Sequence, residues 1–168
     1  MTFPRNVGQI PIYYNAKNTG RPFNDNQKFT SKYLDIPNSP LYPFGFGLSY
    51  TSFSYSPISL NKTTINASDK LEATITITNT GKFDGEETAQ LYIRDVVGSV
   101  TRPVKELKGF QKVFLKASES KKITFALTAN DLKFYDINMK YTYEPGAFML
   151  FIGTNSNDIK EADFKLAL

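Results

Sequence analysis

The chain has 168 residues and a formal net charge of +4, with 20 basic and 16 acidic side chains spread along its length. It contains no cysteine and no histidine, which excludes disulfides, thiolate metal sites and a cysteine nucleophile, and removes the usual general base at neutral pH. No apolar run is long enough to span a membrane, and the basic residues form no patch of the kind that binds nucleic acids. We therefore expect no cofactor, no metal, no nucleic acid and no membrane among its partners.

Residues 1–52 are rich in proline, asparagine and aromatic rings, and they lack a clear helical or strand period. The exception is the stretch 9–15, which alternates like a strand but has no partner strand nearby in the sequence. The segment from Thr19 to Ser56 is crowded with rings, and ordering it costs much conformational freedom. The rings therefore need a surface to pack on.

From residue 53 onward, short segments of alternating apolar and polar residues are separated by turn signals, which is typical of an antiparallel sandwich or barrel. In the clearest segment, 71–78, one face carries Leu71, Ala73, Ile75 and Ile77, and the other carries glutamate and threonine. The other predicted strands are 53–60, 86–95, 107–115, 122–127, 147–153 and, at an edge, 162–166. About seven strands over residues 53–168 predict an all-β, immunoglobulin or fibronectin III-like antiparallel β-sandwich with an irregular N-terminal extension.

Two local features are expected between the later strands. Residues 130–135 predict one helical turn, capped by Asn130 or Asp131. Pro145 followed by Gly146 predicts a type II turn.

The sequence offers no convincing catalytic constellation. Glu86 and Glu87 are the only adjacent carboxylates, and neighbours in a strand point to opposite faces, so they cannot act on one substrate. The stretch 155–158 carries oxygen ligands without the spacing of a known calcium loop, which favours a hairpin loop. We therefore assign no catalytic residue and no metal ligand.

The rings of residues 42–55 allow two interpretations. Aromatic side chains can stack on sugars or bases, or they can be buried against a neighbouring domain. The chain has no tryptophan, the strongest stacking platform, and so many rings in an irregular segment favour burial against another domain.

The segments 18–22 (NTGRP) and 39–53 (SPLYPFGFGLSYTSF) resemble the interdomain junction of glycoside hydrolase family 3, which includes β-glucosidases and β-xylosidases. Three later segments, 76–81 (TITNTG), 84–93 (DGEETAQLYI) and 103–110 (PVKELKGF), resemble the fibronectin type III-like domain at the C-terminus of that family. The matching segments are collinear and span Phe3 to about Phe164, so the chain is identified as similar to the C-terminal part of a family 3 enzyme.

The resemblance implies a parent with a catalytic barrel that bears an aspartate nucleophile, an α/β domain that bears or neighbours the glutamate acid/base, and the fibronectin-like domain last. Retaining hydrolysis of β-glucosides or β-xylosides needs both carboxylates close together. Neither region is present here, so we expect no enzyme activity from this chain alone. Residues 1–52 would comprise the last strand of the missing α/β domain and a connector (18–52), and residues 53–168 the fibronectin-like domain.

The expected role is structural, with the chain packing on the barrel and the α/β domain of the parent. The residues expected to form this interdomain contact are Tyr42, Phe44, Phe46, Leu48, Tyr50 and Phe53. Arg21 and Asp25 are candidates for the rim of the parent's substrate cleft. The uncovered N-terminal segment could also fold back on the sandwich or pair with a second copy. The alternatives are an independent carbohydrate-binding module and a protein-interaction module. The family suggests a periplasmic or secreted protein, although no signal peptide is visible in this chain.

Overall fold

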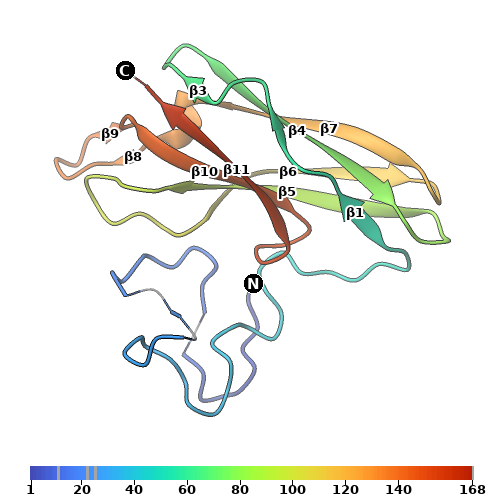
Figure 1. The fold of residues 1–168 in the computed structure, drawn as a ribbon, viewed down its shortest axis with the longest axis horizontal. Coiled ribbons are helices and arrows are strands. Elements are labelled where there is room, and N and C mark those ends of the chain that lie inside the picture. Colours follow the sequence, from blue (N-terminus) through green and yellow to red (C-terminus); the bar gives the residue numbers. More distant parts are fainter. Residues whose placement is uncertain (11, 22, 25, 168) are drawn as a thin grey trace.

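The structure is a computed structural model that describes residues 1–10, 12–21, 23–24 and 26–167. Two β-sheets pack face to face as a sandwich, and the N-terminal residues run as an irregular extension along one side of it (Figure 1). None of the helices in the described ranges is long and apolar enough to cross a membrane. The predicted fold class, an all-β sandwich with an irregular N-terminal extension, is confirmed.

The first sheet is built around β4 (Lys70–Asn79), which pairs antiparallel with β7 (Ser120–Thr128) along most of its length. The other edge of β4 pairs with two short strands, β1 (Phe53–Tyr55) and β2 (Ser59–Leu60). The strand predicted over 53–60 is thus divided in two, because Pro57 has no N–H to donate to the ladder.

The second sheet has the order β3-β11-β10-β5-β6. Its strands are β3 (Thr64–Ile65), β11 (Ile159–Leu166), β10 (Gly146–Gly153), β5 (Gly85–Asp95) and β6 (Glu106–Leu115). All pairs are antiparallel except β3 with β11. The prediction that 162–166 is an edge strand was wrong, because β11 is longer and lies between β10 and β3.

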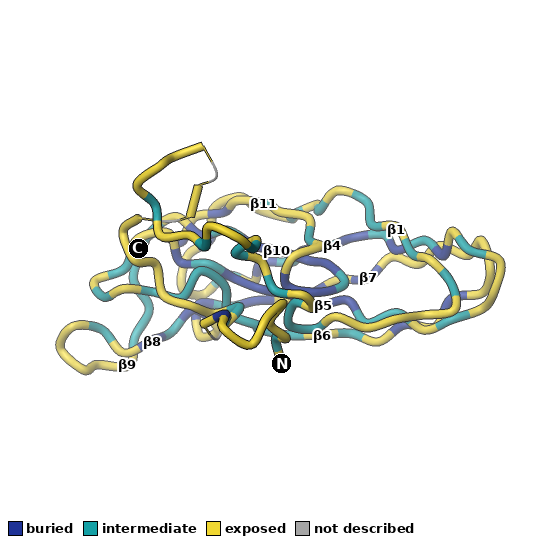
Figure 2. Tube along the Cα trace, turned by 90° about the horizontal axis from the view of Figure 1, so that it is seen from below, coloured by how far each residue is buried: buried dark blue, intermediate teal, exposed yellow. Residues whose placement is uncertain are grey.

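The core lies between the two sheets and follows the predicted alternation. Leu71, Ala73, Ile75 and Ile77 of β4 are buried, as are Ala89, Leu91 and Ile93 of β5 and Ile123, Phe125 and Leu127 of β7. Phe148 of β10 and Phe164 of β11 stack with ring centroids 5.3 Å apart. The dark-blue segments in the middle of Figure 2 mark this core.

A small hairpin projects from one end of the sandwich (Figure 1). It consists of β8 (Phe134–Tyr135) and β9 (Tyr141–Thr142), and it follows a single 3-10 turn, η1 (Ala129–Leu132). The residue before this turn, Thr128, takes the capping position, where its N–H and its hydroxyl both donate to Asp131 at 2.7 and 2.9 Å. The capping position thus belongs to Thr128 and not to the predicted Asn130 or Asp131. Asp131 takes part from inside the turn, as the acceptor of both hydrogen bonds.

Two further predictions concern a turn and a strand, and the first of them was wrong. Gly146 does not form a type II turn, because it begins β10 and its φ is not positive. The stretch 9–15 forms no strand in its described residues, which exclude Pro11. A strand needs the edge of another strand to pair with, and the predicted partner of this stretch belongs to the α/β domain, so this strand stays a prediction.

Candidate interdomain surface

The extension covers part of the outer face of the five-stranded sheet. Gln90 and Tyr92 alternate with core residues along β5, so their side chains point away from the core. They are nevertheless only 7% and 0% exposed. The extension lies in front of this sheet in Figure 2, and its residues Gly45 and Tyr14 contact Gln90 and Tyr92.

The side chain of Gln90 ties the extension to the sandwich. Its Nε2 donates to the carbonyl oxygen of Gly45 at 3.1 Å and to that of Thr154, after β10, at 2.6 Å. Its Oε1 accepts from the hydroxyl of Tyr92. Gly45 has φ +79°, and a Cβ added there would overlap the amide of Gln90, so this position requires glycine both for its backbone angle and for space.

Aromatic stacking supports the same contact. The rings of Tyr14 and Phe44 stack with centroids 4.2 Å apart, and Tyr14 meets Tyr92 edge-on at 5.7 Å. Burial raises the pKa of the Tyr92 hydroxyl, with a smaller contribution from Tyr14, so Tyr92 stays protonated and remains a donor to Gln90. Tyr14 thus links Phe44 to Tyr92 on the outer face of the sheet.

The loop after β10 receives the backbone of the extension. Ser156 donates its N–H to the carbonyl oxygen of Phe44 at 3.0 Å. The side chain of Asn155 shapes this loop, because its Oδ1 accepts from the N–H groups of Asn157 and Asp158, both at 2.9 Å. The stretch 155–158 therefore forms the loop of the β10–β11 hairpin, and its polar groups hold the chain itself.

The first residues of the chain fold back onto this arrangement. Phe3 donates its N–H to the oxygen of Tyr42 and accepts from the N–H of Leu41, both at 2.9 Å. The ring of Tyr42 lies 6.3 Å from that of Phe3 and 4.9 Å from that of Phe46, measured between centroids. Further along, Val104 donates to the oxygen of Ala16 at 2.9 Å. Of the arrangements considered for the N-terminal segment, the structure shows fold-back.

The far end of the connector is fixed as firmly. The hydroxyl of Thr51 donates to Oδ1 of Asn79 at 2.6 Å, and Asn79 is completely buried at the end of β4. The Nδ2 of Asn79 donates in turn to the oxygen of Leu115 at 3.2 Å. Phe53 pairs with Asn79 in the first sheet and packs against the core.

The residues between these anchors project outward. Leu48 and Tyr50 are 92% and 97% exposed, whereas Tyr42 and Phe46 are about half exposed. The six predicted contact residues therefore divide into two groups. Phe44 and Phe53 pack on the sandwich of this chain, and Tyr42, Phe46, Leu48 and Tyr50 offer apolar surface to the outside.

Arg21 is exposed in a loop of the extension. The loop surrounds a hollow of about 630 Å³ lined by Gly20, Arg21, Phe23, Asn24, Gln27, Phe29 and Thr30. Asp25 lies outside the described residues. The structure does not bring Arg21 together with the ring cluster of the connector.

The adjacent carboxylates of β5 point to opposite faces, as predicted. Glu86 pairs with Lys112 on the outer face, while Glu87 accepts a hydrogen bond of 2.7 Å from the hydroxyl of Tyr55. Burial raises the pKa of Glu87. Within the described part of the chain, no group of three or more potential metal ligands gathers.

Sequence reasoning missed Gln90 and Tyr92, which carry the docking of the extension. The signal was present: in residues 89–93 every position except Gln90 is apolar or aromatic, so both faces of this part of β5 were marked for burial. Sequence reasoning also assigned no function to Phe110 and Phe114, which are 68% and 51% exposed on β6.

Residues 87–156 match the model of the fibronectin type III-like domain family. Over 168 residues the chain is 48% identical to the periplasmic beta-glucosidase of Salmonella typhimurium, covering 99% of this chain and 22% of that protein. It is 42% identical to a putative beta-xylosidase of Formosa agariphila, covering 99% and 21%. A beta-glucosidase from Listeria innocua, solved in complex with glucose, superposes with a TM-score of 0.92 at 42% identity, covering 100% of this chain and 24% of that one.

The chain is the C-terminal part of a glycoside hydrolase family 3 protein. The predicted family is thereby confirmed. This family 3 chain spans about a fifth to a quarter of the length of the relatives it matches, so in the larger protein it lies with other domains. The matched family model describes a fibronectin type III-like domain rather than a catalytic domain. None of the comparisons supports self-association.

Proposed function

We propose that this chain is the non-catalytic, stabilising C-terminal part of a β-glycosidase that hydrolyses β-glucosides or β-xylosides by a retaining mechanism. It packs on the catalytic barrel and the α/β domain. Residues 1–52 contribute the last strand of the α/β domain and the connector, and residues 53–168 form the fibronectin-like domain. The names of the relatives support this substrate class.

The exposure of Leu48 and Tyr50 is the observation that carries the proposal. The backbone on either side of them is fixed, by Gln90 before and by Asn79 after, so these side chains are held outward rather than left loose. An apolar side chain kept in water forgoes about 1.5–3 kcal/mol of burial free energy. Two such side chains on an ordered segment indicate a surface that another domain covers.

A chimera tests this role directly. This chain would replace the matching C-terminal part of the Salmonella typhimurium periplasmic beta-glucosidase, and thermal unfolding and aryl β-glucoside hydrolysis would be measured. We expect Leu48→Ser with Tyr50→Ser to lower the unfolding temperature of the chimera but not that of the isolated chain. Ile137→Ser, on the exposed hairpin, is the matched control. Equal unfolding temperatures for the chimera and its double variant would refute the packing role.

The same chimera tests Arg21. If Arg21 lies at the rim of the substrate cleft, Arg21→Ala raises KM or lowers kcat without changing the unfolding temperature. Unchanged kcat and KM would remove Arg21 from the site. The isolated chain should show no hydrolysis above background in the same assay.

A further inference from the structure

The two outer faces of the sandwich differ in chemistry. On the outer face of the first sheet, hydroxyl groups pair across β4 and β7, with Thr74 and Thr124 at 2.9 Å and Thr78 and Ser120 at 2.7 Å. Such a face is well solvated. The outer face of the second sheet ends at β6 with two exposed phenylalanine rings.

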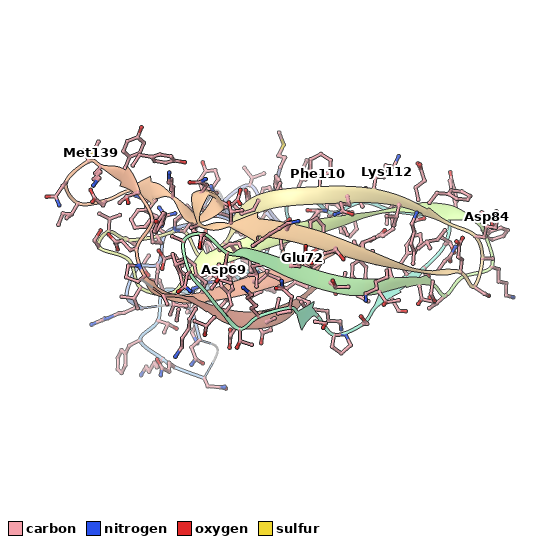
Figure 3. The ribbon with its side chains drawn as sticks, turned by 90° about the horizontal axis from the view of Figure 1, so that it is seen from above. Asp69, Glu72, Asp84, Phe110, Lys112 and Met139 are labelled. Carbon is pink, nitrogen blue, oxygen red and sulfur yellow. The ribbon has the colours of Figure 1, made fainter. Side chains whose placement is uncertain are left out.

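These rings form a short row along β6. Phe110, Lys112 and Phe114 occupy alternate positions, so their side chains leave the strand on the same side. Figure 3 shows Phe110 and Lys112 projecting from β6 in the same direction. Lys112 is paired with Glu86 on the neighbouring strand. We call Phe110 and Phe114 the β6 row.

The β6 row lies on the strand next to β5, whose outer face the extension covers. Phe110 lies directly opposite Gln90 in the register of β5 and β6. Gln90 is the side chain that holds Gly45, and Phe46 follows Gly45 in the chain. The connector is therefore attached to the strand neighbouring β6, at the residue opposite Phe110.

The position of the N-terminus indicates what covers this row. In the relatives the matched part is C-terminal and is only 21–24% of their length, so a body several times larger precedes the position of residue 1. Figures 1 and 2 place the N-terminus within the extension, in front of the outer face of the second sheet. That larger body therefore starts on the side of the sandwich that carries the β6 row.

We propose that the β6 row is covered by the domain of the parent that directly precedes residue 1. This inference rests on the proposed function and adds the sandwich itself, through Phe110 and Phe114, to the interdomain contact. A sugar is a poorer occupant, because the polar groups between the rings, Lys112 and Glu86, already satisfy each other. A second copy is also a poorer occupant, since two rings offer far less than the roughly 800 Å² per partner of a stable interface.

Hydroxyl-radical footprinting read by mass spectrometry tests the proposal without mutation. The modification rates of Phe110 and Phe114 would be measured in the isolated chain and in the Salmonella chimera described above. We expect both rates to fall several-fold in the chimera. Met139, exposed on the projecting hairpin, is the internal control and should react equally in both proteins. A rate for Phe110 in the chimera equal to that in the isolated chain would overturn the proposal.

A variant separates this inference from the proposed function. Phe110→Ser with Phe114→Ser should lower the unfolding temperature of the chimera and leave that of the isolated chain unchanged. If the Leu48 and Tyr50 variant destabilises the chimera but the β6 variant does not, the connector contact stands and the β6 contact fails. If neither variant acts, the packing role itself fails.

Two outcomes in the isolated chain would also overturn the proposal. One is saturable binding of laminarin or a cello-oligosaccharide that the double variant abolishes, which would assign the row to a sugar. The other is concentration-dependent dimerisation in sedimentation that the double variant abolishes, which would assign it to a second copy.

Discussion

Gly45 shows how one residue fixes the path of the connector. Its left-handed backbone is natural for glycine, and the missing side chain leaves room for the amide of Gln90. Gly47, two residues later, has open space around its Cα and no positive φ. The two glycines of the PFGFG stretch therefore have different structural roles.

Gly45→Ala should consequently loosen the connector. The left-handed conformation alone costs an alanine roughly 1–2 kcal/mol, and displacing Gln90 adds to this. We expect faster amide exchange across residues 42–50 with little change in β4. Gly47→Ala is the matched control and should leave exchange unaltered; equal effects of the two substitutions would contradict this account.

Asp95 is a buried carboxylate at the end of β5. Its Oδ2 lies 3.8 Å from Nε of Arg102, and neither atom has a hydrogen-bond partner. Arg102 is shared with Glu106, which accepts from its Nη2 at 2.7 Å, and lies over the ring of Phe134. Burial raises the pKa of Asp95, and the attraction of Arg102 offsets this only in part. Desolvation thus outweighs the ion pair.

The sign of that shift gives a pH prediction. A carboxyl with a raised folded-state pKa contributes stability that is present below its unfolded value near 3.9 and is lost as pH rises through the folded value. Asp95→Asn should therefore make the chain lose less stability between pH 4 and neutrality. Urea midpoints at several pH values measure this, with Glu72→Gln on the solvent face of β4 as control. A steeper loss in Asp95→Asn would contradict the assignment.

At the scale of elements, alternation along β4 decides which side chains hold the sheets together. Ile75 is buried between the sheets, and its neighbour Thr76 faces outward. Ile75→Ala should cost about 2–5 kcal/mol, because it removes buried methyl groups and leaves a cavity.

Thr76→Ala, one residue away, is the matched control and should cost much less. Urea unfolding followed by circular dichroism measures both. Similar losses for the two variants would mean that the alternation does not set the core.

At the scale of the whole molecule, the extension and the sandwich are tied together by Gln90, Tyr92 and the loop at Ser156. A chain of residues 53–168 should still fold cooperatively, because the core lies entirely between the sheets. It should unfold at a lower temperature than the full chain and bind more of a hydrophobic dye, since Tyr92 loses its cover.

Calorimetry and dye fluorescence of the two chains measure this. Failure of residues 53–168 to fold would show that the extension belongs to the folding unit, and that the proposed boundary at residue 53 is misplaced.

The sequence by itself determined the sandwich, most of its strands and the family. The alternation of apolar and polar residues in segments such as 71–78 predicts which face of the strand is buried. Side chains of a strand point to opposite faces in turn, and this period of two does not depend on which strands lie beside it. The motifs of residues 39–53 and 103–110 likewise identified the junction and the domain.

Only the tertiary structure decided where the ring-rich connector goes. Gly45 meets Gln90 and Tyr14 meets Tyr92 through contacts between residues 45 or more positions apart in the chain, which no local period encodes. Leu48 and Phe44 are both apolar residues of the same connector. Leu48 nevertheless projects into water, whereas Phe44 stacks on Tyr14. The difference arises because Gln90 and Asn79 fix the backbone between them, and that backbone then dictates which side chains face outward.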